Sequence, residues 1–182
     1  MTPKCILWCS KYIWCGGFGV RTGGYALILD LEDEVRLSAG KKSFLLQSST
    51  YVYSGSALNG LKNRVRRHTR TWRQSLASGS MKKHWHIDYL LPLATAMTTV
   101  CAQTEFRTEC LLVEFLVAKG FTPIKGFGSS DCRRCTGHLL QSPYTLNAAR
   151  SASHEKTVTS VLEAFRAMGL NDVARHSPSK SG

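Results

Sequence analysis

Acidic residues are scarce in this chain of 182 residues, which holds 12 Asp and Glu against 24 Lys and Arg. The net charge is +12 at pH 7, and no acidic residue occurs between positions 41 and 87, where there are ten Lys and Arg. Such an excess of positive charge says little about the fold but indicates a polyanionic partner. The alternative is a solvated basic face. Nucleic acid is favoured over a membrane surface by the aromatic residues of the same segment, Tyr51, Tyr53, Trp72 and Trp85.

The chain also lacks an apolar run long enough to span a bilayer, and its first residues do not form a signal-peptide pattern. Its seven cysteines are an odd number, which without a secretory signal predicts reduced thiols and a cytoplasmic location. Three of them, Cys5, Cys9 and Cys15, have a spacing that matches no common metal site, so we expect ordinary thiols there. The length suits one compact domain. We expect no membrane partner.

Alternation of apolar and polar residues predicts several short strands, and a period near 3.6 predicts helices. The expected strands are Tyr25–Asp30, joined by an acidic turn into a hairpin with Val35–Ser38, then Phe44–Gln47, Thr50–Tyr53, 94–103 and 121–127. The expected helices are Leu61–Gly79, Thr104–Lys119 and a segment around Val158–Phe165. The polar tail from His176 is expected to be disordered.

The first of these helices has two different sides. Its predicted apolar stripe comprises Leu61, Val65, Trp72 and Leu76. Arg64 and His68, four residues apart, share a face at the margin of this stripe. The predicted contacts to nucleic acid lie on the far side and in the segment after the helix, at Lys62, Arg66, Arg67, Arg70, Arg73, Lys82 and Lys83.

One set of residues suits phosphodiester hydrolysis: Tyr25, Tyr53, Arg64, His68 and Glu109. The reaction needs a base for water, a cation to stabilise the phosphate, and a divalent metal to shield charge. Each residue also has a structural alternative: Tyr53 as strand packing, Arg64 as a solvated helix arginine, and Glu109 as a charge at a helix N-terminus.

A second set could hold zinc. Cys132, Cys135 and His138 follow a C-x2-C-x2-H spacing, and thiolates with imidazoles make tetrahedral zinc sites. In an extended chain the polar residues of the segment at 84–88 share one side, so they are candidates for completing the site: His84, His86 and Asp88. The alternatives are a reduced loop without metal, or a segment at 84–88 that lines a nuclease cleft.

Several motifs resemble those of the GIY-YIG nuclease superfamily. Gly23-Gly24-Tyr25 and Tyr53-Ser54-Gly55 are similar to its two short motifs, and LKNRV at 61–65 is similar to the helix that carries its catalytic arginine. His68 matches a histidine of several members, and the segment from Glu109 resembles the helix whose first glutamate binds the metal. Two longer motifs, HWHIDYL at 84–90 and GFGSSDC at 126–132, resemble one branch of the superfamily, whose members are sometimes fused to an endonuclease III-like glycosylase.

The resemblance implies an α+β fold with a small three-stranded, mixed or antiparallel sheet flanked by helices, an extra N-terminal hairpin and a C-terminal helix. The expected divisions are an N-terminal extension at 1–22, a nuclease domain at 23–143, and a C-terminal helix with a flexible tail at 144–182.

The resemblance also implies a divalent-metal-dependent DNA endonuclease, with a role and a partner in DNA repair; RNA stays open as a second partner. Glu109 would bind Mg²⁺ or Mn²⁺, and Arg64 would stabilise the transition-state phosphate. Tyr25 and Tyr53 would orient or deprotonate the attacking water, assisted by His68. The alternative is a non-catalytic nucleic-acid-binding module with the same fold, stabilised by zinc.

Overall fold

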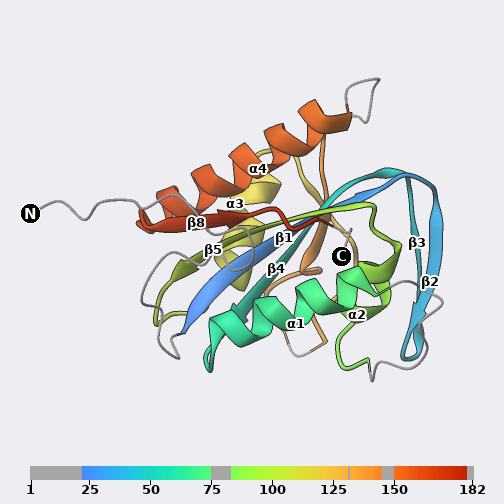
Figure 1. The fold of residues 1–182 in the computed structure, drawn as a ribbon, viewed down its shortest axis with the longest axis horizontal. Helices are drawn as coiled ribbons and strands as arrows, with labels where there is room; N and C mark the ends of the chain where they lie inside the picture. Colours follow the sequence, from blue (N-terminus) through green and yellow to red (C-terminus); the bar gives the residue numbers. More distant parts are fainter. Residues whose placement is uncertain (1–21, 75–82, 131, 145–149, 180–182) are drawn as a thin grey trace, which may run out of the picture.

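The structure is a computed structural model that describes residues 22–74, 83–130, 132–144 and 150–179 (Figure 1). Its α+β class is the one predicted. The strands are β1 (Gly23–Leu31), β2 (Val35–Ala39), β3 (Lys42–Leu46), β4 (Ser49–Ala57), β5 (Ala96–Gln103), β6 (Thr122–Pro123), β7 (Leu139–Gln141) and β8 (Val173–His176). The helices are α1 (Leu61–Arg73), α2 (Ile87–Leu90), the 3-10 turn Leu91–Leu93, α3 (Glu109–Ala118) and α4 (Arg150–Ala167).

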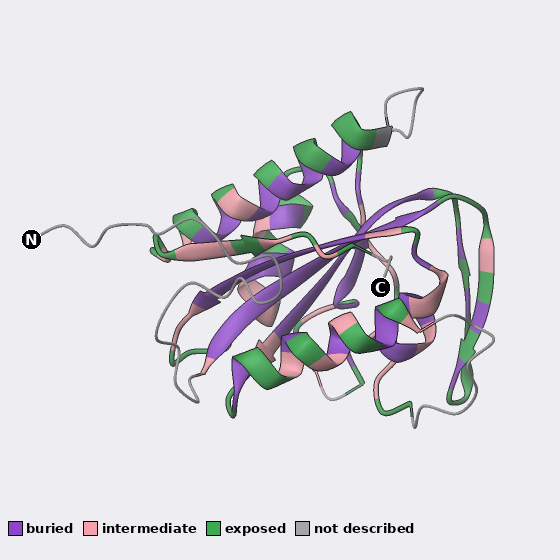
Figure 2. Cartoon of the chain, in the orientation of Figure 1, coloured by how far each residue is buried: buried purple, intermediate pink, exposed green. Residues whose placement is uncertain are grey.

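The main sheet has six strands in the order β6-β7-β4-β1-β5-β8, and all of its neighbours are antiparallel. The three-stranded sheet expected from the sequence is its centre, β4-β1-β5. All nine residues of β1 are buried, because this strand has a partner on each side and helices over both faces (Figure 2). The sheet therefore supplies a rigid base on which side chains of β1 and β4 are positioned.

The sequence predicted that Val35–Ser38 pairs with β1 in a hairpin, and this pairing is wrong. Strand β2 pairs with β3, and the turn between them contains Gly40 at φ +63°. Both edges of β1 are occupied by β4 and β5, so no edge is left for β2. The hairpin instead forms a separate two-stranded ribbon that extends beside α2 (Figure 1).

Alternate residues of β1 face two separate hydrophobic cores. Leu27 and Leu29 belong to the core under α1 and α2, whereas Ala26 and Ile28 belong to the core under α3 and α4. This is the two-residue period of a strand that is covered on both faces. Helix α4 is integral to the second core, where its most deeply buried side chains include Val158, Val161 and Phe165.

Several predicted boundaries are wrong for tertiary reasons. Helix α1 ends at Arg73, because Gln74 is extended, and the predicted end near Ser78 and Leu76 of the apolar stripe lie outside the described residues. Helix α3 starts at Glu109, with Thr108 as its N-cap. His176 is not the start of a disordered tail but the last residue of β8, which pairs with β5.

A buried polar network ties α4 to the sheet. His154 Nδ1 lies 2.8 Å from Asp30 Oδ2, and its Nε2 lies 2.8 Å from Thr98 Oγ1. Thr50 Oγ1 donates to the other oxygen of Asp30 at 2.8 Å. Buried polar groups are stable only when they are paired in this way. The network therefore fixes how α4 sits on β1, β4 and β5.

Candidate active site

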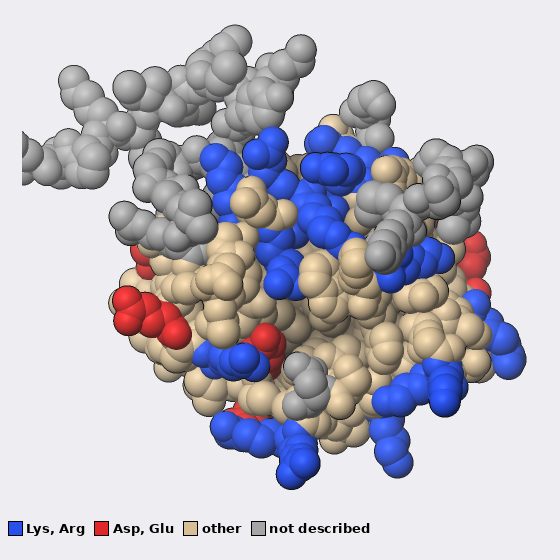
Figure 3. All heavy atoms as spheres, turned by 90° about the horizontal axis from the view of Figure 1, so that it is seen from below, with Lys and Arg blue, Asp and Glu red and all other residues tan. Residues whose placement is uncertain are grey.

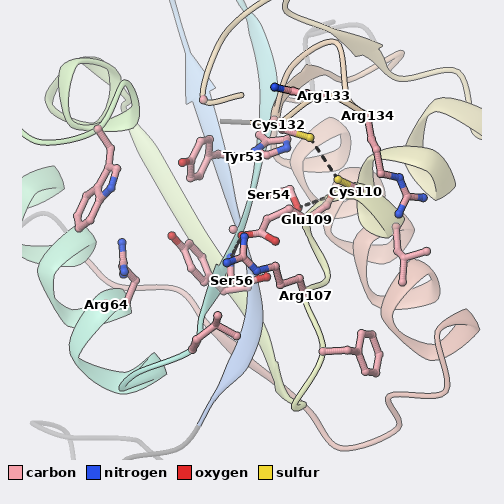
Figure 4. Close-up of a pocket in the computed structure, with 18 of the residues that line it drawn as sticks. Tyr53, Ser54, Ser56, Arg64, Arg107, Glu109, Cys110, Cys132, Arg133 and Arg134 are labelled. Atoms are coloured by element: carbon pink, nitrogen blue, oxygen red, sulfur yellow. Dashed lines mark hydrogen bonds between the residues drawn. The ribbon is translucent and has the colours of Figure 1, made fainter. Parts of the chain in front are cut away.

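A cleft of about 920 Å³ opens where the edge of β4 is left uncovered (Figure 4). Strand β7 pairs with β4 only as far as Tyr53, and Ser54 N then donates to His138 O at 2.8 Å. Beyond this point, Ser56 N donates to Glu109 Oε1 at 3.0 Å. The carboxylate at the start of α3 thus caps a backbone N–H that the sheet leaves unpaired. Side chains from both faces of the sheet can meet at this open edge.

Four of the five predicted catalytic residues line this one cleft. Tyr25 comes from β1, Tyr53 from β4, Arg64 from α1 and Glu109 from α3. In Figure 4, Arg64 enters from α1 on one side, and Glu109 enters from the side of α3. The fifth residue, His68, lies behind Tyr25 and is 1% exposed. Residues that are far apart in sequence are therefore brought to one place.

Tyr25 and His68 form a buried pair, with 3.0 Å between the Tyr25 hydroxyl and His68 Nε2. Burial raises the pKa of Tyr25 well above its usual value and outweighs the opposite effect of Arg64. Burial also lowers the pKa of His68 to about 4, against the opposing field of Asp88. The imidazole is therefore neutral near pH 7. His68 Nδ1 lies 4.0 Å from Asp88 Oδ1, which favours the proton on Nδ1 and leaves Nε2 to accept from Tyr25.

Asp88 is held by a bidentate ion pair with Arg67, at 3.0 and 2.8 Å. It also accepts the backbone N–H groups of His84 and Trp85 at 2.8 and 3.1 Å. Burial alone would raise the pKa of Asp88, but these donors outweigh it and lower the pKa. Two predictions are corrected here. Arg67 is engaged with Asp88 rather than free for nucleic acid, and the segment at 84–88 is a capped turn leading into α2 rather than an extended strand.

Trp85 is a site residue for which the sequence suggested no role beyond an aromatic in a basic segment. It lines the cleft, and the guanidinium carbons of Arg64 and Arg67 each lie 4.2 Å from its ring centroid. Cation–π contacts of this kind are worth about 0.5–2 kcal/mol. The indole therefore holds Arg64 in one orientation at the wall of the cleft.

The glycines of the short motifs are required by close approaches. A Cβ on Gly55 would lie 2.4 Å from Cζ of Tyr25, so the tyrosine ring packs directly on the backbone of β4. A Cβ on Gly24 would lie 2.1 Å from Thr108 Oγ1, at the N-cap of α3. These two positions let Tyr25 and the start of α3 approach the sheet, and this sets the width of the cleft.

A candidate metal site lies beside Glu109. Its donor atoms lie within 4.8 Å of one another, and we call it the Cys3His cluster: Cys110, Cys132, Cys135 and His138. The sulfur atoms of Cys110 and Cys132 are 3.5 Å apart and face one another in Figure 4. Cys135 N donates to Cys132 Sγ at 3.3 Å. Burial alone would raise the pKa of Cys132, but hydrogen bonds, first that from Cys135 N–H, lower it to about 6.

The predicted partners of Cys132, Cys135 and His138 are corrected by this arrangement. His86 Nδ1 accepts from Gly128 N at 3.0 Å, and His84 is exposed. Asp88, the third candidate, is engaged with Arg67. Cys110 completes the group instead. It lies directly after Glu109, in the first turn of α3. One sequence signal could have pointed to Cys110. The C-x2-C-x2-H motif supplies only three of the four ligands of a tetrahedral zinc site, and the chain has few other thiols that could be the fourth.

Basic side chains surround the cleft (Figure 3). The predicted contacts that are exposed on or after α1 are Lys62, Arg66, Arg70, Arg73 and Lys83. Lys82 lies outside the described residues, as do Cys5, Cys9 and Cys15. Three further arginines, which no sequence motif indicated, line the cleft on the side of α3, namely Arg107, Arg133 and Arg134. Positive charge therefore flanks the site on both sides, although Arg134 is paired with Glu114 at 3.1 Å.

Comparison with known proteins gives one family match. The model of "Domain of unknown function DUF123" matches residues 24–161. The chain belongs to the DUF123 family. DUF123 is a GIY-YIG-like family, which agrees with the resemblance found from the short motifs. No curated protein and no solved structure matched the chain.

The DUF123 match includes every residue named above in the cleft and in the Cys3His cluster. It extends into α4, beyond the division expected at residue 143, in agreement with the packing of α4 into the second core. None of the described helices of this DUF123 protein has both the length and the apolar character needed to cross a bilayer.

Proposed function

We propose that this protein is a divalent-metal-dependent endonuclease that hydrolyses DNA phosphodiester bonds. The observation that carries this proposal is the convergence of Tyr25, Tyr53, Arg64 and Glu109 on one cleft. A base, a cation and a carboxylate are the groups that phosphodiester hydrolysis requires. The exposed basic side chains of α1 beside the cleft would attract the polyanionic substrate.

The carboxylate of Glu109 fits a hard cation such as Mg²⁺ or Mn²⁺. Among the described residues, Ser56 N–H is its one hydrogen-bond partner, through Oε1. No other acidic residue among those described lines the cleft. One protein carboxylate is enough for Mg²⁺, which keeps several waters and takes further oxygens from substrate phosphates. When bound, the ion would polarise the phosphate and lower the pKa of an attacking water.

Tyr25 and His68 would take the proton from the water. The raised pKa of Tyr25 disfavours a stable phenolate, but the neutral His68 accepts at Nε2 from the tyrosine hydroxyl. As the water oxygen bonds to phosphorus, its proton passes to the Tyr25 oxygen, and the Tyr25 proton passes to His68. The bond from phosphorus to the leaving oxygen then breaks, its electron pair stays on that oxygen, and the oxygen takes a proton from solvent. The imidazolium formed would face Asp88, whose carboxylate stabilises that charge.

Arg64 would stabilise the negative charge that develops on the phosphate. Its contact with Trp85 restricts the guanidinium before substrate arrives, so little reorganisation is needed in the transition state. Tyr53 would orient the substrate or the water from β4. These roles match those implied by the GIY-YIG resemblance, which also implies a function in DNA repair with a repair protein as partner. The odd number of cysteines adds the proposal of a cytoplasmic location.

For the Cys3His cluster we propose Zn²⁺, because three thiols and an imidazole are typical zinc ligands. The second candidate function is a non-catalytic nucleic-acid-binding module that this zinc stabilises. It is favoured by one observation, the single carboxylate among the described residues that line the cleft. Such a module would bind DNA or RNA in a salt-sensitive way without turnover.

The test is an incubation with Mg²⁺ or Mn²⁺ and a panel of plain, nicked, branched and damaged DNA, with RNA added as a further substrate. We expect metal-dependent cleavage of at least one DNA. Arg64→Ala should reduce the rate by about 10²–10³-fold. Arg36→Ala, on the exposed side of β2 and away from the cleft, is the matched control. Binding without cleavage by the wild-type chain, or equal rates for both variants, would support the non-catalytic module.

A further inference from the structure

The donor set of the Cys3His cluster differs from that of the Glu109 site in a way that separates the two metals. Three of its four donors are thiols, and none of the described carboxylates belongs to it. Soft thiolates select Zn²⁺ and bind Mg²⁺ or Mn²⁺ poorly. Four protein ligands also fill a tetrahedron and leave no open position for a substrate or a water. That pattern is the one of structural zinc sites rather than catalytic ones.

A second observation points independently to a bound ion. His138 is 7% exposed, and its Nε2 has no hydrogen-bond partner among the described residues. A buried polar nitrogen left unpaired costs about 1–3 kcal/mol. Bonding of this nitrogen to a metal would use a lone pair that the other described residues leave unused. The cluster therefore combines typical zinc ligands with a buried imidazole nitrogen that has no hydrogen-bond partner among the described residues.

The ligands come from two separate segments of the chain. Cys110 belongs to the first turn of α3, and the other three ligands belong to the loop between β6 and β7. This loop is anchored to the sheet at its end, where His138 O accepts from Ser54 N. Earlier in the loop, its contact with α3 includes the exposed ion pair between Arg134 and Glu114. Exposed pairs contribute about 0–1 kcal/mol, so a metal would be the stronger link.

We propose that the Cys3His cluster binds one structural Zn²⁺, which fastens the loop between β6 and β7 to the first turn of α3. Cys110 follows Glu109 directly, so the same link fixes the turn from which the Glu109 carboxylate enters the cleft. Zinc binding and fastening of the loop stand without the nuclease. Only the consequence for catalysis rests on the proposed function.

Elemental analysis of the full chain, purified without chelators, tests the site directly. We expect one zinc per chain, and X-ray absorption at the zinc edge should show three sulfur ligands at about 2.3 Å and one nitrogen at about 2.0–2.1 Å. Cys132→Ala should lose the zinc, whereas Cys101→Ala, at a buried thiol of β5 outside the cluster, should retain it. A wild-type chain that takes up no zinc, or zinc without sulfur ligands, would overturn the site.

Amide hydrogen exchange tests whether zinc fastens the loop between β6 and β7 to α3. It uses the wild-type chain, so the result does not depend on the folding of a variant. Removal of zinc by a chelator should raise exchange in the first turn of α3 and in the loop at 132–138, while α4 stays protected. No change in these two segments would overturn the fastening role. If the zinc-loaded chain shows this pattern but cleaves no nucleic acid, the zinc site stands and the proposed nuclease function fails.

Discussion

At the scale of single residues, the cleft depends on groups whose protonation states are set by burial. Tyr25 and His68 share a hydrogen bond of 3.0 Å in a setting that disfavours charge on either side chain. Asp88 remains charged because Arg67 and two backbone N–H groups stabilise its carboxylate. His68 is a neutral acceptor, and the fixed carboxylate of Asp88 offsets part of the cost that burial places on its protonated form.

Tyr25→Phe tests this relay while preserving the shape of the ring. We expect the cleavage rate to fall by about 10²–10⁴-fold, because the hydroxyl that carries the proton is gone. The matched control is Tyr51→Phe, which removes the hydroxyl that donates to Gln47 O at 2.9 Å, outside the cleft. Single-turnover cleavage of the best substrate measures both. Equal losses in the two variants would mean that Tyr25 acts only in packing.

The depressed pKa of His68 predicts a pH dependence of stability. The folded pKa is about 4 against an unfolded value of 6.5, so the unfolded state binds more protons between these values. The free energy of unfolding should therefore be highest above pH 6.5, where this contribution of His68 is fully present. It should fall by about 3 kcal/mol as the pH drops to 4.

Denaturant titrations between pH 4 and 7 check this slope. His68→Gln should flatten it, whereas His84→Gln, at an exposed histidine of the neighbouring segment, should leave it unchanged. A slope that is the same in the wild type and in His68→Gln would contradict the assigned state of His68.

At the scale of elements, α1 combines two kinds of arginine that sequence alone cannot tell apart. Arg66 is exposed, and Arg67 forms the bidentate pair with the buried Asp88. Their neighbours and charges look alike along the chain. The difference arises because the 100° step between successive helical residues turns one side chain to solvent and the next toward α2.

Paired substitutions separate the two roles. Arg66→Ala should weaken DNA binding and lower the slope of log affinity against log salt by about 0.9, because one phosphate contact is lost. Arg67→Ala should instead lower the free energy of unfolding by about 3 kcal/mol, since Asp88 keeps a buried charge without its cation. Binding isotherms at several salt concentrations, with thermal unfolding of both variants, measure these outcomes. A stable Arg67→Ala chain with a reduced salt slope would reverse the assignment.

What could be predicted from sequence was local. The apolar stripe of α1 follows from helical period, and Leu61, Val65 and Trp72 are buried as expected. The pairing of β2 with β3 and the addition of β8 to β5 depend on which strand edges remain free, which no local pattern encodes. Within the site, the two short motifs indicated Tyr25 and Tyr53, and the resemblance of the helix from Glu109 indicated that carboxylate. Cys110 could not be chosen, because its partners arrive from a loop more than twenty positions later.

At the scale of the whole molecule, the cleft and the buried network that ties α4 to the sheet lie apart. One face of the sheet holds α1 and α2, the other is packed by α3 and α4, and the cleft at the open edge of β4 takes side chains from both. The network of His154 with Asp30 and Thr98 lies on the second face, and none of its members lines the cleft. Stability and catalysis should therefore be separable by substitution.

His154→Ala tests that separation. The substitution removes the hydrogen bonds of His154 to Asp30 Oδ2 and Thr98 Oγ1. The free energy of unfolding should therefore fall by about 1–3 kcal/mol. The cleavage rate of the folded fraction should stay unchanged. Thr159→Ala, at an exposed position of the same helix, serves as the control. A loss of activity without a loss of stability would connect this network to the cleft.

The proposed nuclease function depends most on Glu109, which would hold the metal needed for phosphodiester hydrolysis. The most direct measurement is the cleavage rate as a function of Mn²⁺ concentration for Glu109→Gln, compared with Glu105→Gln at the exposed position four residues earlier. Glutamine keeps the size and can still accept from Ser56 N–H but loses the charge that binds the cation. We predict wild-type rates for Glu105→Gln and no metal-dependent cleavage for Glu109→Gln. Unchanged Mn²⁺-dependent cleavage by Glu109→Gln would contradict the account.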